Sequence, residues 1–205
     1  MPIQSWFPTQ IYIETLQRDR KKTRDLQKRL LHEIEDIREL DGAGIAWSKQ
    51  NYGPGFTSYA SANDLSRRSP TFAELERAID VHVKKFAKAL DLDLRGKKLE
   101  MTTCWVNVMP KGARHGMHLH PLSVVSGTFY VTVPKGASGL KFEDPRHDRM
   151  MAAPARKARA RRENQLFASY APEAGKLVLF ESWLKHEVPV NGSKEARISI
   201  SFNYA

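Results

Sequence analysis

Three histidines in the second half of the chain have the residue type and spacing of a metal site. His118 and His120 are separated by one residue, and His186 follows much later in the sequence. Side chains two residues apart on an extended segment point to the same face, so the first two imidazoles could bind one ion. Neutral imidazole is a good ligand for divalent iron. The sequence therefore predicts that His118, His120 and His186 hold a metal ion.

The elements that must position these histidines have the period of strands. From residue 99 onward, apolar and polar side chains alternate, and Pro110-Lys111-Gly112 is typical of a turn. The pattern predicts strands at residues 101–109, 127–133, 139–142, 176–180 and 197–202. Residues 146–171 between two of them show little periodicity, and we expect this insert to be mobile at least in part.

The first 98 residues are expected to support this β-rich part. An edge strand is predicted at residues 6–13, and apolar residues recur at helical spacing in residues 23–40. A second amphipathic helix is predicted to begin at residues 69–71, where Thr71 and Glu74 have capping-box spacing. Residues 41–69 are rich in glycine, serine and asparagine, which indicates an irregular loop that could cover a site.

The order of these parts resembles that of the iron(II)- and 2-oxoglutarate-dependent oxygenases. The resemblance is carried by His118-Leu119-His120-Pro121, by a glycine-led apolar strand before His186-Glu187-Val188, and by Arg197-Ile198-Ser199. It is strongest from residue 105 to residue 203 and looks like an uncharacterised bacterial branch of the superfamily. His120 departs from the common pattern, because the family has a carboxylate at that position.

The resemblance implies a mostly β fold with flanking helices. In this fold, a double-stranded β-helix or jelly-roll barrel is formed by residues 99–205, and the two N-terminal amphipathic helices pack outside it. It implies iron(II) and 2-oxoglutarate as cofactors, molecular oxygen as co-reactant, and hydroxylation of an unidentified small molecule or peptide. Arg197 and Ser199 match the residues that hold the far carboxylate of 2-oxoglutarate, a task that suits the planar guanidinium fork. Tyr130 and Asn107 occupy places where related enzymes present further polar groups to the cosubstrate.

Two other functions are compatible with these residues. A three-histidine, cupin-like dioxygenase or isomerase would use the metal without 2-oxoglutarate, although Ser123, Val124 and Val125 stand where cupins commonly have a glutamate. A non-catalytic barrel could instead sense a carboxylate ligand while the basic insert binds an anionic partner. Asp144 is a further candidate carboxylate, but Asp-Pro at a strand end is typical of a turn. His115, three residues before His118, is predicted to lie on the opposite strand face.

Length and composition bound these hypotheses. The chain has 205 residues, of which 41% are hydrophobic and 27% charged, and this suits one globular domain. No run approaches the roughly 18 apolar residues of a membrane span, and no signal peptide is visible, so a cytoplasmic location is expected.

Cys104 is the only cysteine, which excludes an internal disulfide. The net charge of +10 gathers partly in residues 18–29 and 156–162. Neither cluster has interleaved aromatic residues, so nucleic acid is not an expected partner.

Overall fold

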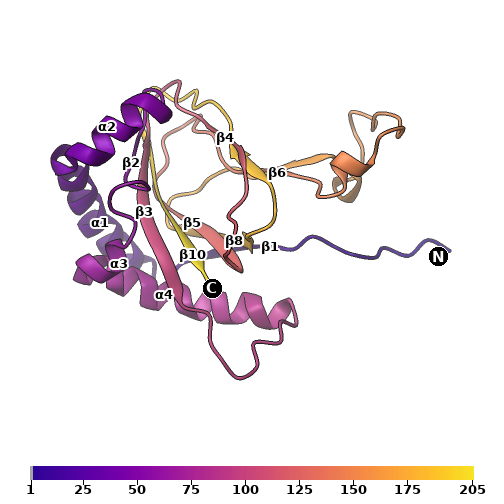
Figure 1. Ribbon diagram of the computed structural model, residues 1–205, viewed down its shortest axis with the longest axis horizontal. Coiled ribbons are helices and arrows are strands. Elements are labelled where there is room, and N and C mark those ends of the chain that lie inside the picture. Colours follow the sequence, from indigo (N-terminus) through magenta and orange to yellow (C-terminus); the bar gives the residue numbers. More distant parts are fainter. Residues whose placement is uncertain (1) are drawn as a thin grey trace.

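A computed structural model describes residues 2–205 (Figure 1). The helices are α1 (Arg20–Leu40), α2 (Gly42–Asn51), α3 (Leu65–Arg68) and α4 (Pro70–Ala89). The strands are β1 (Ile11–Thr15), β2 (Phe56–Thr57), β3 (Met101–Met109), β4 (His115–His118), β5 (Val125–Thr132), β6 (Lys141–Glu143), β7 (Phe167–Ser169), β8 (Lys176–Glu181), β9 (His186–Val188) and β10 (Arg197–Tyr204). No helix within residues 2–205 has the length and apolar character needed to cross a membrane.

The strands form two antiparallel sheets. The large sheet has six strands in the order β1-β8-β5-β10-β3-β2, and the small sheet has four in the order β4-β9-β6-β7. Hydrogen-bonded ladders join the described strands into these two sheets and not into one closed barrel. The prediction was a mostly β fold with flanking helices around a double-stranded β-helix barrel. The structure supports its coarser form, mostly antiparallel sheets with some helices, which is consistent with a jelly roll.

The large sheet has two chemically different faces because side chains alternate along its strands. On one face, its residues join the buried side of α1 and α4 in a single apolar core, which includes Leu30, Phe72, Val106, Phe129 and Ile200. Figure 1 shows α1 and α4 lying together on this side of the sheet. The opposite face turns toward the small sheet and carries the polar residues of the site. Burying each large apolar side chain stabilises this arrangement by about 1.5–3 kcal/mol.

The second amphipathic helix is present, but it begins with a different cap. Ser69 is the N-cap of α4, and its side-chain oxygen accepts hydrogen bonds from the backbone N–H groups of Thr71 and Phe72. Pro70 occupies the first turn, where a missing N–H costs nothing. The predicted capping box at Thr71 is therefore replaced by a serine cap two residues earlier.

The prediction of an irregular loop at residues 41–69 is wrong. This segment contains α2, β2 and α3. Asp41 ends α1 and also begins α2, because its carboxylate accepts a hydrogen bond from the N–H of Gly44 at 2.9 Å. Asp41 is thus both the C-cap of α1 and the N-cap of α2. Next to the site, β2 pairs with β3, with Phe56 opposite Val108, and the side chain of Ser48 in α2 bonds to the backbone of Thr57 in β2.

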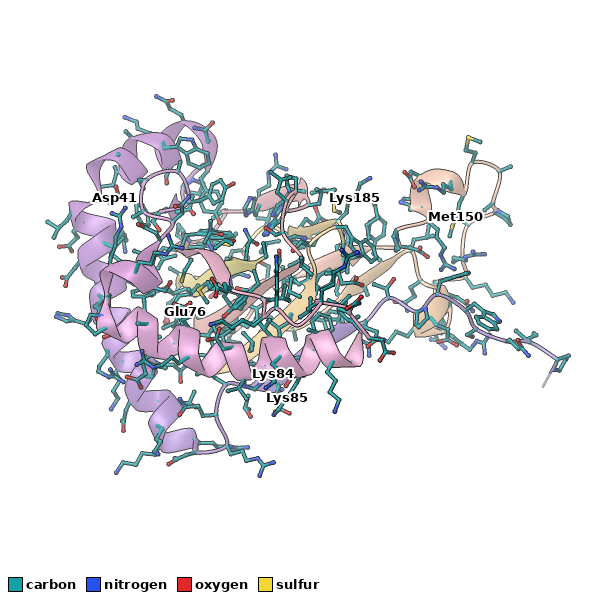
Figure 2. All side chains as sticks on the ribbon, turned by 60° about the horizontal axis from the view of Figure 1, so that its bottom comes forward. Asp41, Glu76, Lys84, Lys85, Met150 and Lys185 are labelled. Atoms are coloured by element: carbon teal, nitrogen blue, oxygen red, sulfur yellow. The ribbon has the colours of Figure 1, made fainter. Side chains whose placement is uncertain are left out.

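The N-terminal edge strand and the insert lie at the periphery. The strand β1 pairs with β8 at the edge of the large sheet, as expected, but it spans Ile11–Thr15 and begins later than predicted. Residues 146–165 project from the body (Figure 1), and Met150 is labelled within this projection in Figure 2. These residues include seven exposed Lys and Arg side chains: Arg146, Arg149, Arg156, Lys157, Arg159, Arg161 and Arg162. Near the end of the insert, Phe167–Ser169 forms β7, which pairs with β6.

Candidate metal and cosubstrate site

The three predicted histidines converge at one end of the small sheet. His118, the last residue of β4, lies opposite His186, the first residue of β9. His120 lies just beyond β4, where its backbone N–H donates to the carbonyl of Ser182 at 3.0 Å. One nitrogen of each imidazole lies within 4.8 Å of the other two, so a single ion can be shared among them.

The imidazoles of His118 and His186 are oriented by backbone carbonyls. Nδ1 of His118 bonds to the carbonyl of Gly116 at 2.7 Å, and Nδ1 of His186 bonds to the carbonyl of Leu184 at 2.9 Å. A carbonyl can only accept, so each Nδ1 must carry its proton. Nε2 is then the unprotonated nitrogen and is free to bind a metal.

His120 is oriented by side chains from the large sheet. Its Nδ1 lies 2.5 Å from Oδ1 of Asn203, whose Nδ2 donates to Oγ1 of Thr103 at 3.0 Å. The second bond fixes the amide, so that its oxygen faces the imidazole. Ser126 adds a contact of 2.9 Å to the same Nδ1. The pocket behind this position therefore presents an acceptor, which suits an imidazole N–H and would repel a carboxylate.

All three imidazoles are held neutral. Burial lowers the pKa of His186 to about 3 and that of His120 to about 4, and it also lowers the pKa of His118. Neighbouring imidazoles act in the same direction on His186 and His120 because like charges repel. Neutral imidazoles leave their lone pairs available to a cation at physiological pH.

The metal-free protein is expected to lose stability as the pH falls from 7 to 5. His186 is 3% exposed, and its pKa is about 3 in the folded protein against 6.5 for the free side chain. The unfolded chain therefore binds a proton in this window that the folded protein does not, which costs the folded state about 2 kcal/mol at pH 5. Urea denaturation with a chelator present measures this loss. The variant His186→Gln should show a shallower pH dependence, and identical slopes would contradict the assignment.

His115 faces the cavity, contrary to the prediction. Its ring stacks on that of His118, with centroids 4.2 Å apart and planes 14° apart. The register of β4 against β9 shifts between these two residues, so an irregularity in the strand turns both rings to one side. His115 nevertheless lies outside the group of three whose nitrogens converge.

Arg197 places a buried positive charge beside the histidines. Its side chain is 3% exposed, and Nη1 donates to the carbonyl of Ser138 at 3.0 Å. Nη2 contacts Sδ of Met109 at 3.0 Å and Oγ of Ser199 at 3.4 Å, while Nε has no partner within residues 2–205. No carboxylate of the described chain forms an ion pair with it. A buried guanidinium without a counter-ion is costly, so this place calls for an anionic ligand.

Tyr130 and Asn107 lie next to Arg197, on the strands that flank β10. Ser199 is opposite Asn107 in β3 and opposite Tyr130 in β5. The guanidinium carbon of Arg197 lies 5.5 Å from the centre of the Tyr130 ring. The hydroxyl of Tyr130 and Oδ1 of Asn107 are buried and have no hydrogen-bond partner in the described part of the chain. The hydroxyl of Tyr130 can therefore donate a hydrogen bond to a ligand, whereas the free atom of Asn107 can only accept one.

A cavity joins the histidines to Arg197, and some of its lining residues were not predicted. Asn107, His118, His120, His186 and Arg197 line it together with Tyr52, Trp105, His115, Gly127, Thr128, Leu140, Phe180, Val188 and Ser201. Tyr52 comes from the segment predicted to be a loop that could cover a site, and an aromatic residue among glycines was the only signal. The alternative ligand Asp144 does not reach the cavity, since it forms an ion pair with Arg146 at 2.8 Å.

Residues 103–203 match the family model described as "Putative 2OG-Fe(II) oxygenase". The matched range contains every predicted site residue and excludes Tyr52. A search of curated proteins found no match to the chain.

Solved structures share the fold across almost the whole chain. The prolyl-4-hydroxylase of Pseudomonas putida is 16% identical in sequence, with a TM-score of 0.59. The match covers 96% of this chain and 92% of the hydroxylase chain. The epimerase SnoN from nogalamycin biosynthesis, solved with Fe³⁺ and alpha-ketoglutarate, is 14% identical over 96% of this chain and 78% of its own, with a TM-score of 0.65. HygX from Streptomyces hygroscopicus, solved with nickel and 2-oxoglutarate, is 14% identical, with a TM-score of 0.61. The match covers 96% of this chain and 83% of the HygX chain. The segment that carries the histidines and Arg197 therefore matches a family described as 2OG-Fe(II) oxygenases, and the chain shares its fold with proteins solved with a metal and 2-oxoglutarate or alpha-ketoglutarate.

Proposed function

We propose that the protein is an iron(II)- and 2-oxoglutarate-dependent oxygenase of the hydroxylase type, acting on a small molecule or a peptide. In this proposal, His118, His120 and His186 bind iron. Arg197 and Ser199 bind the far carboxylate of 2-oxoglutarate, with Tyr130 and Asn107 as further polar contacts. The observation that carries the proposal is a buried, unpaired guanidinium in the same cavity as three neutral, converging imidazoles.

The residues fit both cofactors by charge and by hydrogen bonding. Three neutral imidazoles offer Nε2 to a cation, and none of them must lose a proton first. The unpaired Nε of Arg197 and the unpaired hydroxyl of Tyr130 are donors that an anionic oxygen acceptor would satisfy. Bound there, iron(II) and 2-oxoglutarate would supply the activation of molecular oxygen for oxidation of a substrate. A three-imidazole face would carry one more positive charge than a face with a carboxylate.

The protein's own part is to hold the ligands and keep water out. Phe180 packs against the ring of His186 with centroids 4.5 Å apart, and the ring of Phe142 lies 6.0 Å from that of His186. Trp105 lies 5.9 Å from the ring of His120. These aromatic walls restrict rotation of the imidazoles and lower the local dielectric, which strengthens the attraction between the cofactor carboxylate and Arg197.

A metal-dependent dioxygenase or isomerase without 2-oxoglutarate is the second candidate. It is favoured by the third imidazole, since His120 stands where the superfamily commonly has a carboxylate. In this candidate, Arg197 would bind the acidic group of a substrate other than 2-oxoglutarate. The two candidates differ in whether the iron-loaded protein acquires the metal-to-ligand absorption of bound 2-oxoglutarate.

The test begins with anaerobic titration of the iron-loaded protein with 2-oxoglutarate, followed by exposure to oxygen and measurement of succinate. The proposal expects a new visible absorption band on titration, and then succinate that requires both iron and oxygen. Iron binding without any binding of 2-oxoglutarate would reject the proposal and leave the second candidate.

Asn203→Ala is expected to weaken iron binding by about 10- to 100-fold, because a group that orients a metal-binding histidine contributes about this much. The variant removes the acceptor that holds Nδ1 of His120 and frees its ring to rotate. Competition with a metal-sensitive dye measures the affinity. Thr102→Ala, which removes a hydroxyl contact to the backbone carbonyl of Asn203 and leaves its side chain in place, is the control. An unchanged affinity in Asn203→Ala would show that Asn203 does not orient a metal ligand.

A further inference from the structure

Tyr52 brings a group from outside the matched family segment into the cavity. It is the C-cap of α2, where its backbone N–H donates to the carbonyl of Ser48 at 2.8 Å. The residue is 5% exposed and lines the same cavity as Arg197 and the histidines. Its ring meets that of His115 edge-on, with centroids 5.4 Å apart. The side chain is therefore held between α2 and the site.

The backbone nearby is shaped to hold the Tyr52 ring in this position. A Cβ atom on Gly55 would lie 2.7 and 2.8 Å from two ring carbons of Tyr52 and 3.2 Å from the carbonyl oxygen of Val108. The first two distances are closer than carbon atoms approach one another without a clash. The absence of a side chain at Gly55 lets the chain turn back toward β3 while the ring keeps its place in the cavity.

The hydroxyl of Tyr52 lacks a hydrogen-bond partner among residues 2–205, although it is buried. An unsatisfied buried hydroxyl costs free energy in the folded state, about 1–3 kcal/mol for such groups in general. Burial also raises the pKa of Tyr52 to about 12, while the positive charge of Arg197, which lines the same cavity, acts in the opposite direction. At neutral pH the hydroxyl is therefore a proton donor in the same cavity as a guanidinium whose Nε also has no partner in the described chain.

We propose that the Tyr52 hydroxyl donates a hydrogen bond to the same cosubstrate carboxylate that Arg197 binds. The inference rests on the proposed function and adds a residue of the N-terminal half to it. One carboxylate would then satisfy two buried donors that have no acceptor in the described chain. Because Tyr52 caps α2, the contact also makes the helical cover of the site part of the cosubstrate pocket.

The test is Tyr52→Phe, measured for 2-oxoglutarate affinity in the iron-loaded protein under anaerobic conditions and for thermal stability without ligands. Loss of a hydrogen bond to a charged group predicts an affinity about 10-fold lower or more. Iron affinity should stay unchanged. Without 2-oxoglutarate the variant should melt at the same temperature as the wild type or higher, since it loses an unsatisfied polar group. Adding 2-oxoglutarate should raise the melting temperature of the wild type more than that of the variant.

Tyr204→Phe is the matched control. Tyr204 is also buried, but its hydroxyl donates to Oδ1 of Asp80 at 2.7 Å, and it belongs to the core on the helical side of the large sheet. This variant should melt at a lower temperature than the wild type and bind 2-oxoglutarate equally well. The two tyrosines are thus expected to differ in the sign of the stability change as well as in ligand affinity.

The outcomes separate this inference from the proposed function. If the wild type binds 2-oxoglutarate and Tyr52→Phe binds it equally well, the inference is overturned and the proposed function stands. A melting temperature lowered as in Tyr204→Phe, with unchanged affinity, would also overturn it by making Tyr52 a structural residue. If the wild type binds iron but no 2-oxoglutarate, the proposed function fails first, and this inference fails with it.

Discussion

Arg197→Lys is expected to weaken 2-oxoglutarate binding by about 30-fold or more, while the affinity for iron stays nearly unchanged. The guanidinium is buried and has no acidic partner in the described chain, so the ligand carboxylate would be its counter-ion. A lysine keeps the charge but cannot form two parallel hydrogen bonds from a planar fork. Loss of one partner's contacts in a buried charge pair costs about 2–5 kcal/mol. Paired titrations of iron and of 2-oxoglutarate measure the two affinities in the same preparation.

Arg29→Lys provides the control for this substitution. Arg29 forms two hydrogen bonds with the carboxylate of Glu74, at 2.9 and 2.8 Å, on the exposed side of the helices. The same chemical change there should leave both affinities as they are, because an exposed ion pair contributes about 1 kcal/mol or less to stability. If Arg197→Lys lost iron and 2-oxoglutarate equally, Arg197 would support the fold and not the ligand.

His186→Ala is expected to act in the opposite order and to lower iron affinity by more than about 100-fold. Removal of a direct ligand should exceed the 10- to 100-fold losses seen when only an orienting partner is removed. Binding of 2-oxoglutarate should weaken as a consequence, since its keto acid end would lose the metal. Dye competition for iron, followed by 2-oxoglutarate titration at saturating iron, separates the two effects.

His82→Ala tests whether loss of any buried histidine gives the same result. His82 lies on α4, where its ring nitrogens contact the hydroxyl of Tyr12 and the carbonyl of Leu16, each at 2.8 Å. This variant should be less stable than the wild type and should bind iron normally. Retention of iron by His186→Ala would remove His186 from the metal site and would leave two of the three proposed ligands.

Much of the fold and part of the site could be predicted because both depend on simple periods. Alternation along β10 places Arg197 and Ser199 on one face; Arg197 lines the cavity, while Ser199 does not line it and contacts Nη2 of Arg197 at 3.4 Å. The structure brings His118, His120 and His186 together as the spacing indicated, although β4 ends at His118 and His120 lies beyond it. Their convergence therefore owes more to the bond between His120 and Ser182 than to strand alternation.

The residues that were missed depend on local irregularities and on distant contacts. His115 reaches the cavity because β4 changes register, which no count of residues reveals. Asn203 follows the predicted strand at residues 197–202 and was given no role; that role appears when β10 is placed beside β5 and behind His120. Tyr52 lies in a segment rich in turn residues whose helix is started by Asp41, the residue that also ends α1. Propensity cannot distinguish those two uses of one capping residue.

The two faces of β10 have a consequence for how this chain can change during evolution. Arg197 and Ser201 line the cavity and Asn203 contacts His120 from the same face, while Ile200, Phe202 and Tyr204 belong to the core under the helices. Replacing a residue on one face leaves the other face intact, so ligand preference can drift without loss of the core. Inserting or deleting a single residue would exchange the two faces along the rest of the strand, placing apolar side chains in the cavity and a guanidinium in the core. Divergent relatives should therefore differ in which residues β10 carries and agree in its length.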